Sequence, residues 1–417
     1  MDEVRGISKL DLKRRNRKQI LLSIREAGQL ARVDIAKRLA LTRAAVTIIT
    51  NTMVSQGILI EVAQKAAADN EPRTRGRKKT MICINPNYKF VFGVAITERQ
   101  LSIGLANLGG DVMDKAYMDI DDDTELQAIT SFLAKNIKSM LKNSSLERKQ
   151  ILGLGIGIMP SRVALLRGEE KKTGWEFARV KNMLELELEM PVHINNLIGL
   201  YALANIDYPS QRYMTQVVLY SGDQYHASII ANNEMVSGMG RDTDVINSYI
   251  VTPNGEACDG YPNGSVYAEL SKPALIRRAA AILKADPAEL TFDRISEAYK
   301  KGDKKIVALL NDAAEKLALM VYNVAIANGA ERVVLQSFAL IPETEQVLRE
   351  TLAKLIGPGK RTLALDLSKL TPDHSFVAGS NWCVEQQFID LGGMTRFETS
   401  NGSMIYGYNP EDKIYHN

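Results

Sequence analysis

The residues best suited to chemistry lie near the amino terminus, where their types favour contacts with nucleic acid. Arg43, Ala44, Thr47 and Asn51 recur at the spacing of one helix face. Arginine and asparagine side chains can hydrogen-bond base edges or phosphates, and small side chains let a helix enter the major groove closely. Thr42 stands directly before this run, where a threonine commonly caps a helix. The contacts to DNA that we expect from this region are made by Arg32, Thr42, Arg43, Ala44, Thr47 and Asn51.

A second basic cluster lies in the polar segment 63–80. Its centre, Arg75-Gly76-Arg77, is small, flexible and doubly basic. Such a unit can lie in a narrow minor groove, where the negative potential is enhanced and a glycine lets the backbone come close. The alternative is a solvated linker between two domains. The residues that we expect to touch the minor groove or the phosphates are Arg73, Arg75, Gly76, Arg77 and Lys78.

The distribution of charge separates a basic amino-terminal part from an acidic remainder. The 417 residues carry 52 Lys and Arg and 49 Asp and Glu, a formal net charge of +3. Residues 1–89 hold 19 of the basic and 8 of the acidic residues, so the other 328 residues hold 33 and 41. The first part therefore carries +11 and the second −8. This asymmetry favours a polyanionic partner for residues 1–89, with a solvated basic tail as the alternative.

Three helices and two strands are expected to position these residues. The elements are helices over 14–27 and 33–39, a third helix that begins after Thr42 and ends at Gly57, and strands over 58–62 and 81–84. In the third helix Val46, Ile49 and Met53 form the buried stripe. This is the plan of a winged helix-turn-helix, with residues 1–63 as the DNA-binding domain and 64–89 as the basic wing and linker. The alternative is a three-helix module that binds protein.

The rest of the chain has the pattern of an α/β body. Strand-like runs cover 91–96, 101–108 and 151–158, and helical periodicity covers about 124–142. The run 151–158 is continuously apolar, as expected for a strand in a sheet that is covered on both faces. Strand and helix signals then alternate to about residue 390. The tail 394–417 is polar and aromatic, and is either a loose end or an arm that packs on another subunit.

Composition excludes several classes of protein. No apolar stretch approaches the about 18 residues needed to span a bilayer, and the charged first 18 residues contain no secretory signal segment. We therefore expect a cytoplasmic protein with no membrane partner. The three cysteines, Cys83, Cys258 and Cys383, are far apart in sequence and odd in number, which excludes a disulfide framework.

One order of motifs is specific enough to suggest a family. A winged helix is followed by Gly76-Arg77-Lys78-Lys79-Thr80, then Ile84-Asn85-Pro86, two hairpin strands and Gly155-Ile156-Gly157-Ile158-Met159-Pro160. Over about residues 8–393 the chain resembles the N-acetylglucosamine and xylose repressor branch of the ROK family (repressors, open reading frames and sugar kinases). This resemblance implies a two-lobed, actin-like ATPase fold. The first lobe would be 90–197, completed by 380–393, and the second lobe, 198–379, would serve oligomerisation and effector sensing.

The chain departs from the family's kinases where their chemistry resides. In place of the phosphate loop Asp-x-Gly-x-Thr it has Ala95-Ile96-Thr97-Glu98-Arg99. In place of the catalytic Asn-Asp pair it has Asn195-Asn196, and an amide cannot act as a general base at neutral pH. Two glycine-rich segments are replaced by 225–228 and 336–338. We therefore expect no catalytic residues, no cofactor and no enzymatic activity.

The family's zinc and sugar ligands are also largely replaced. The resemblance places Ser248, Cys258, Gly260 and Ser265 at the zinc positions, and one thiolate cannot hold structural zinc, so we expect no metal. Val245, Ser248 and Tyr267 stand where the family grips sugar hydroxyls. The residues left as a candidate effector cleft are Asn195, Asn196, His226 and Glu269. Asn195 and Asn196 otherwise cap a helix, and His226 otherwise has a core or surface role.

These observations predict a sequence-specific DNA-binding transcriptional regulator, most simply a repressor. Because one winged helix buries too little surface for specific control, a homodimer or tetramer on a palindromic operator is expected. By resemblance the regulated genes concern carbohydrate use. The effector is a small molecule, a protein or none. The alternatives are a pseudokinase-like interaction protein and a sugar kinase that carries an added amino-terminal domain.

Overall fold

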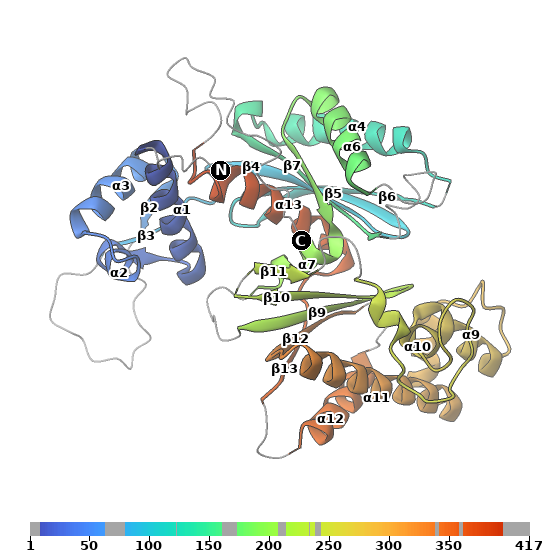
Figure 1. The fold of residues 1–417 in the computed structure, drawn as a ribbon. Coiled ribbons are helices and arrows are strands. Elements are labelled where there is room, and N and C mark those ends of the chain that lie inside the picture. The colour runs from blue at the N-terminus through green and yellow to red at the C-terminus, as the bar shows by residue number, and fades with distance from the viewer. Residues whose placement is uncertain are drawn as a thin grey trace, which may run out of the picture.

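The computed structural model describes residues 9–62, 80–121, 123–160, 173–206, 214–232, 234–237, 243–337, 342–357 and 362–394. Within these residues it contains a three-stranded sheet and two five-stranded sheets. Figure 1 shows the small sheet and its helices as a head beside two larger lobes. Residues 63–79 of the expected basic loop and 395–417 of the expected tail lie outside the described residues.

The head is a winged helix-turn-helix, as the sequence predicts. Its elements are α1 (Lys9–Ala27), β1 (Leu30–Ala31), α2 (Arg32–Arg38), α3 (Arg43–Ser55), β2 (Leu59–Val62) and β3 (Met81–Ile84). The strands pair antiparallel in the order β1-β3-β2. Thr42 caps α3, because its Oγ1 accepts a hydrogen bond from the backbone N of Ala45 at 3.2 Å. The helices pack through the fully buried side chains of Ile24, Ile35 and Val46.

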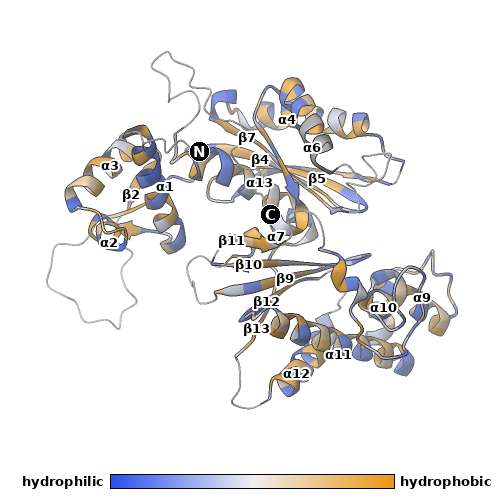
Figure 2. Cartoon of the chain, viewed as in Figure 1, coloured by the Kyte–Doolittle hydropathy of each residue, from blue (hydrophilic) through white to orange (hydrophobic). Residues whose placement is uncertain are grey.

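The first lobe is built on a mixed sheet in the order β6-β5-β4-β7-β8. Its elements are β4 (Phe90–Ile96), β5 (Gln100–Asn107), β6 (Val112–Asp119), α4 (Leu126–Ser144), β7 (Ile151–Ile158), α6 (Thr173–Leu188) and β8 (Val192–Asn196). Strands β4, β7 and β8 are parallel neighbours. Helices α4 and α6 contribute to the core on one face. In Figure 2, α4 carries both hydrophobic and hydrophilic residues, as expected for a helix with one buried face.

The second lobe has a mixed sheet in the order β11-β10-β9-β12-β13. Its elements are α7 (Leu197–Ala204), β9 (Thr215–Ser221), β10 (Tyr225–Ala231), β11 (Glu234–Ser237), α8 (Val266–Leu270), α9 (Lys272–Leu283), α10 (Phe292–Lys300), α11 (Lys304–Ala327), β12 (Arg332–Ser337), α12 (Glu345–Ile356) and β13 (Ala364–Leu367). The long helix α11 supplies much of the core, packing against α8, β12 and α12. None of the helices among the described residues has both the length and the apolar character needed to cross a membrane.

Helix α13 (Phe376–Val384) covers the other face of the first sheet. The backbone of α13 can approach β4 and β7 closely because glycines, which have no side chain, occupy the points of contact. A Cβ placed on Gly155 would lie 1.9 Å from the carbonyl oxygen of Gly379, and one on Gly93 would lie 2.1 Å from that of Phe376. The returning segment already contacts the first sheet at Asp373, whose carbonyl oxygen accepts a hydrogen bond from the hydroxyl of Tyr117 in β6 at 2.8 Å, ahead of the expected boundary at residue 380.

The head is held against the carboxyl end of the body by basic side chains of α1. Arg17, only 1% exposed, donates from Nε to the carbonyl of Gly392 at 2.7 Å and from Nη2 to Oε1 of Gln56 at 2.9 Å. Two neighbouring ion pairs join Lys18 to Asp390 (2.6 Å) and Arg25 to Glu385 (2.5 Å). Phe388 and Ile389 of the following π-helix, η5 (Glu385–Ile389), belong to the same hydrophobic core as α1 and α3.

Candidate nucleic-acid interface

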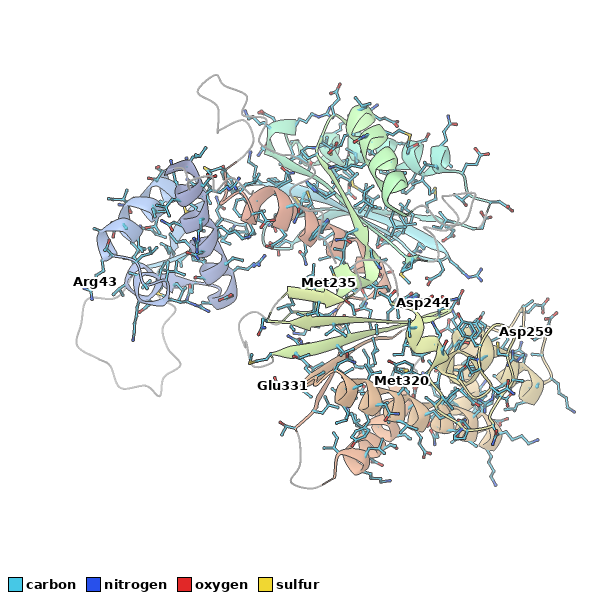
Figure 3. The ribbon with its side chains drawn as sticks, in the orientation of Figure 1. Arg43, Met235, Asp244, Asp259, Met320 and Glu331 are labelled. Carbon is cyan, nitrogen blue, oxygen red and sulfur yellow. The ribbon has the colours of Figure 1, made fainter. Side chains whose placement is uncertain are left out.

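Helix α3 presents one face to solvent. Arg43, Ala44, Thr47 and Asn51 are all exposed, while Val46, Thr50 and Met53 on the opposite side are buried. Figure 3 shows Arg43 at the outer end of the head, on the side away from the two lobes. The predicted residues of this helix are therefore brought together on one accessible surface. The buried stripe differs from the prediction in that Thr50 is fully buried and Ile49 is only partly so.

Arg32 belongs to this surface but is held by the head itself. Its Nε donates to Oγ1 of Thr50 at 3.0 Å, and its Nη2 donates to Oδ1 of Asn51 at 2.9 Å and to Oε1 of Glu61 at 2.7 Å. The guanidinium thus links α2, α3 and β2. Because Arg32 occupies Oδ1 of Asn51, it orients that amide so that its NH₂ group is available to an outside acceptor. We therefore regard Arg32 as a positioning residue for Asn51.

The wing predicted from Arg73, Arg75, Gly76, Arg77 and Lys78 lies outside the described residues. The strands on either side of it are described. Val62, the last residue of β2, pairs with Met81, the first of β3. The two ends of the basic loop are therefore adjacent in one antiparallel hairpin, which is the topology that a wing requires.

The body places Asn195 and Asn196 at the carboxyl end of β8. Oδ1 of Asn196 accepts a hydrogen bond from the backbone N of Ile198 at 2.9 Å and caps α7. Oδ1 of Asn195 accepts one from the backbone N of Asn196 at 2.8 Å. The helix-capping alternative is confirmed for Asn196. A role of either amide in binding an effector stays a prediction.

Aromatic and charged side chains connect the two lobes. Tyr201 of α7 stacks on Tyr220 of β9 with ring centroids 5.8 Å apart, and both are buried. The loop after β4 reaches the second lobe, because Glu98 accepts a hydrogen bond from the hydroxyl of Tyr220 (3.4 Å) and Arg99 pairs with Asp223 (3.6 Å). This loop stands where the kinases of the resembled family have their phosphate loop, and here it joins the lobes.

His226 lies in β10 opposite Tyr220 of β9, with the two ring centroids 6.1 Å apart, and is 1% exposed. Its Nδ1 is 3.2 Å from Oγ1 of Thr243. Burial lowers the pKa of the imidazole from its usual 6.5 to about 4, although the carboxylate of Asp244 opposes the shift. The side chain is therefore neutral and enclosed at pH 7, which favours a core role over contact with a ligand.

This burial predicts that acid destabilises the protein through His226. Because the unfolded chain keeps the usual pKa of 6.5, it binds the extra proton between pH 6.5 and about 4, and the folded state loses stability as the pH falls through that window. In His226→Gln, the difference in unfolding free energy between pH 7 and pH 5 should be smaller by about 2 kcal/mol, as measured by urea denaturation. The control is His374→Gln, at a partly exposed histidine. An unchanged pH dependence in His226→Gln would contradict this explanation.

Glu269 is 1% exposed in α8, and other parts of the chain occupy its carboxylate. Oε1 accepts a hydrogen bond from the backbone N of Glu256 at 2.7 Å. Oε2 pairs with Lys316 at 2.8 Å and with Arg278 at 3.3 Å. A packing role therefore explains its contacts, while binding of an effector stays a prediction. The hydrogen bonds described here for Asn195, Asn196, His226 and Glu269 do not link these four candidates into one cleft.

The region compared with a zinc site lacks a cluster of ligands. Ser265 caps α8 by accepting from the backbone N of Ala268 at 3.3 Å, and Cys258 is a free thiol. Among the described residues, no group of three or more His, Cys, Asp and Glu side chains is close enough to hold a metal ion.

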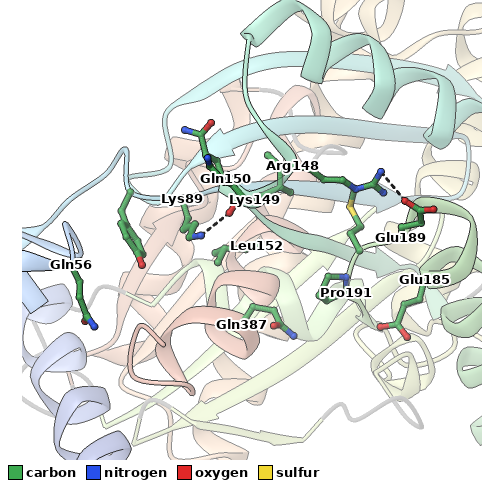
Figure 4. Close-up of a pocket in the computed structure, with 13 residues that line it drawn as sticks. Gln56, Lys89, Arg148, Lys149, Gln150, Leu152, Glu185, Glu189, Pro191 and Gln387 are labelled. Carbon is green, nitrogen blue, oxygen red and sulfur yellow. Dashed lines mark hydrogen bonds and ion pairs between the residues drawn. The ribbon is translucent and has the colours of Figure 1, made fainter. Parts of the chain in front are cut away.

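A pocket that the sequence did not reveal lies where the head meets the body. It has a volume of about 900 Å³ and an apolar floor that includes Leu152 and Met190. Gln56, the C-cap of α3, contributes to its wall. Figure 4 shows Lys89 bonded to the carbonyl of Lys149 at its edge, together with an ion pair between Arg148 and Glu189. Its walls come from segments far apart in the chain, so no local pattern could have identified it.

Comparison with known sequences relates this chain to the ROK family and to named transcriptional regulators. The sequence profile of the ROK family matches residues 91–364. The chain is 21% identical over 340 residues to the xylose repressor of Caldicellulosiruptor bescii. This alignment covers 78% of this chain and 83% of that protein. It is 23% identical over 310 residues to the DNA-binding transcriptional dual regulator NagC of Escherichia coli K12. That alignment covers 71% of this chain and 74% of that protein.

Solved structures agree on the fold. A ROK family transcriptional regulator described as a homolog of the E. coli MLC protein superposes with a TM-score of 0.67 at 18% identity, covering 91% of this chain and 97% of that one. The ROK hexokinase of Thermus thermophilus gives a TM-score of 0.56 at 16% identity, covering 70% of this chain and 97% of that one. The two lobes therefore have the actin-like architecture that the sequence resemblance implied.

Proposed function

The chain belongs to the ROK family, and from this membership we propose that it is a sequence-specific DNA-binding transcriptional regulator, a repressor of carbohydrate-related genes. The observation that carries the proposal is the exposed face of α3, where Arg43, Thr47 and Asn51 lie together on the head. Relatives named as xylose and NagC regulators support the choice of sugar genes. The third helix would enter the major groove, and the basic wing would lie on the minor groove or the phosphates.

We propose further that the body holds two or four copies together on a palindromic operator. A single winged helix buries less surface than specific protein–DNA recognition usually needs, so paired heads would supply the missing contacts. The two lobes are the larger part of the chain and are the natural place for the interface between copies. An effector, either a small molecule or a protein, would act on the interlobe residues or on the pocket beside Gln56.

The direct test is selection of bound sequences from random duplex DNA by the full-length chain. A regulator should prefer its operator to random DNA by about 10³-fold or more at fixed salt. A preference below tenfold would support the alternative of a pseudokinase-like interaction protein. Genome-wide mapping of bound DNA would then name the regulated genes.

We propose that the body does not catalyse phosphoryl transfer. Asn196 stands where a general base would be needed, and its Oδ1 caps α7. The loop from Thr97 to Arg99 lacks the glycine that allows close approach to phosphates and instead contacts the second lobe. The alternative, a sugar kinase with an added head, would be revived if ADP accumulated when the protein is incubated with ATP and a panel of sugars.

The proposed wing leads to a quantitative prediction. Replacing both Arg75 and Arg77 with alanine should weaken operator binding and lower the slope of log K against log salt by up to about two units, because each lost phosphate contact removes about 0.9 units. The slope is measured by fluorescence anisotropy at several salt concentrations. The control is a far-lobe double variant, Arg294→Ala with Lys301→Ala, which removes the same charge from exposed positions on the second lobe. Equal slopes in the wing variant and the wild type would remove the wing from the proposed mechanism.

A further inference from the structure

The hydroxyl groups of α3 use their protons within the helix. Oγ1 of Thr47 donates to the carbonyl of Arg43 at 2.8 Å, and Oγ1 of Thr52 donates to that of Ile48 at 2.9 Å. Since a hydroxyl has one proton, neither threonine can donate a hydrogen bond to a base while these bonds persist. Each keeps its γ-methyl group and its lone pairs. The outward donors left among the predicted α3 contacts are the side chains of Arg43 and Asn51.

Ile48 stands on the outer side of the same helix and is 68% exposed. At about 100° per residue it points roughly opposite the buried side chains of Val46, Thr50 and Met53. Packing therefore does not account for an isoleucine at this position. Ala44 lies one turn before Ile48 and is also exposed, so the two side chains are neighbours on one face. With the γ-methyl of Thr47, they give the middle of α3 an apolar surface between two polar ends.

Such a surface matches one feature of the major groove. Thymine is the base that presents a methyl group there, at C5, and apolar side chains recognise it by direct contact. We infer that Ile48 is a specificity-determining residue that contacts the C5-methyl group of a thymine near the centre of each operator half-site. Arg43 and Asn51 would then hydrogen-bond bases or phosphates on either side. This inference rests on the proposed function and adds to it the base that the centre of α3 recognises.

The test removes the methyl group from the DNA. The operator selected by the full-length protein is resynthesised with deoxyuridine at one thymine position at a time, which keeps the base pair and O4 but lacks the C5-methyl. We expect one thymine per half-site at which this change weakens binding by about fourfold, the effect of leaving one buried methyl-sized group without its contact. Changing both half-sites should weaken binding by about fifteenfold. Affinities are measured by fluorescence anisotropy at one salt concentration.

A double-mutant cycle assigns the effect to Ile48. In Ile48→Ala the same deoxyuridine substitution should change the affinity by less than about 1.5-fold, because the contact has already been lost. Leu186→Ala, which shortens another highly exposed apolar residue outside the head, should keep the full response. Circular dichroism and the Tm of Ile48→Ala establish that the variant is folded. The deoxyuridine series on the wild type is informative without any variant.

The outcomes separate this inference from the proposed function. If the protein prefers no duplex, the proposed function fails, and the inference fails with it. If an operator is found but no thymine in it responds to deoxyuridine, or if the response persists in Ile48→Ala, the inference is overturned while the proposed function stands. A response that disappears in Ile48→Ala and persists in Leu186→Ala supports the inference.

Discussion

Replacing Arg43 and Asn51 together with alanine should lower the affinity for the operator by about 2–6 kcal/mol, or at least about thirtyfold, because each well-placed base contact contributes about 1–3 kcal/mol. Binding to random DNA should change much less, since it depends mainly on the total positive charge. The measurement is the ratio of the two affinities at one salt concentration. A ratio that stays within threefold of wild type would contradict the assignment of α3 as the recognition helix.

The fold should survive this double substitution. Both side chains are exposed, and Arg43 occupies the first turn of α3, where a positive charge is unfavourable to the helix dipole. Arg32 loses one acceptor when Asn51 is removed but keeps Thr50 and Glu61. We therefore expect a Tm close to that of the wild type. Arg294→Ala alone removes the same single positive charge from an exposed position on the second lobe; it is the matched control and should keep the wild-type ratio.

Replacing Glu269 with alanine should lower the unfolding free energy of the protein by about 3–5 kcal/mol, the usual cost of removing one partner from a buried ion pair. The carboxylate is 1% exposed and holds Lys316, Arg278 and the backbone N of Glu256. Without it, the ammonium group of Lys316 loses one of the two ion pairs described here and keeps the one with Asp312, at 2.8 Å. The measurement is urea denaturation at pH 7.

Two further variants test this explanation. Glu269→Gln keeps the oxygen that accepts from Glu256 and loses only the charge, so it should be destabilised less than the alanine variant. Glu297→Ala removes a carboxylate from an exposed pair with Lys301 and should change stability by no more than about 1 kcal/mol. If Glu269→Ala is as stable as Glu297→Ala, the carboxylate does not stabilise the second lobe, and its assignment to a ligand site regains support.

The head was the part most open to prediction, because its signals are local. The cap at Thr42, the outer face of α3 and the strands on either side of the basic loop follow from spacing and side-chain type within a few residues. Thr50 shows the limit of this reasoning. Its hydroxyl donates to the carbonyl of Val46 at 2.8 Å, which lets a polar side chain be buried where hydropathy favoured Ile49.

The contacts of charged and polar residues in the body could not be predicted. His226 meets Thr243, and Glu269 meets Lys316, through loops and helices whose arrangement is set by the whole fold. The sequence grouped both residues in a candidate cleft from the resemblance alone. In the same way, the positive charge of the first 89 residues favours nucleic acid as a partner, yet the guanidinium of Arg17 is buried against Gly392. Composition counts charges but does not say which of them remain on the surface.

The bond from Arg17 to Gly392 spans 375 positions of the chain and has a consequence for biosynthesis. The ribosome makes the head before the body, while the residues that secure it, Glu385, Asp390 and Gly392, follow the second lobe in the chain. During translation the head is therefore a tethered domain without its final orientation. The head can take its fixed position on the body only after Glu385, Asp390 and Gly392 have left the exit tunnel.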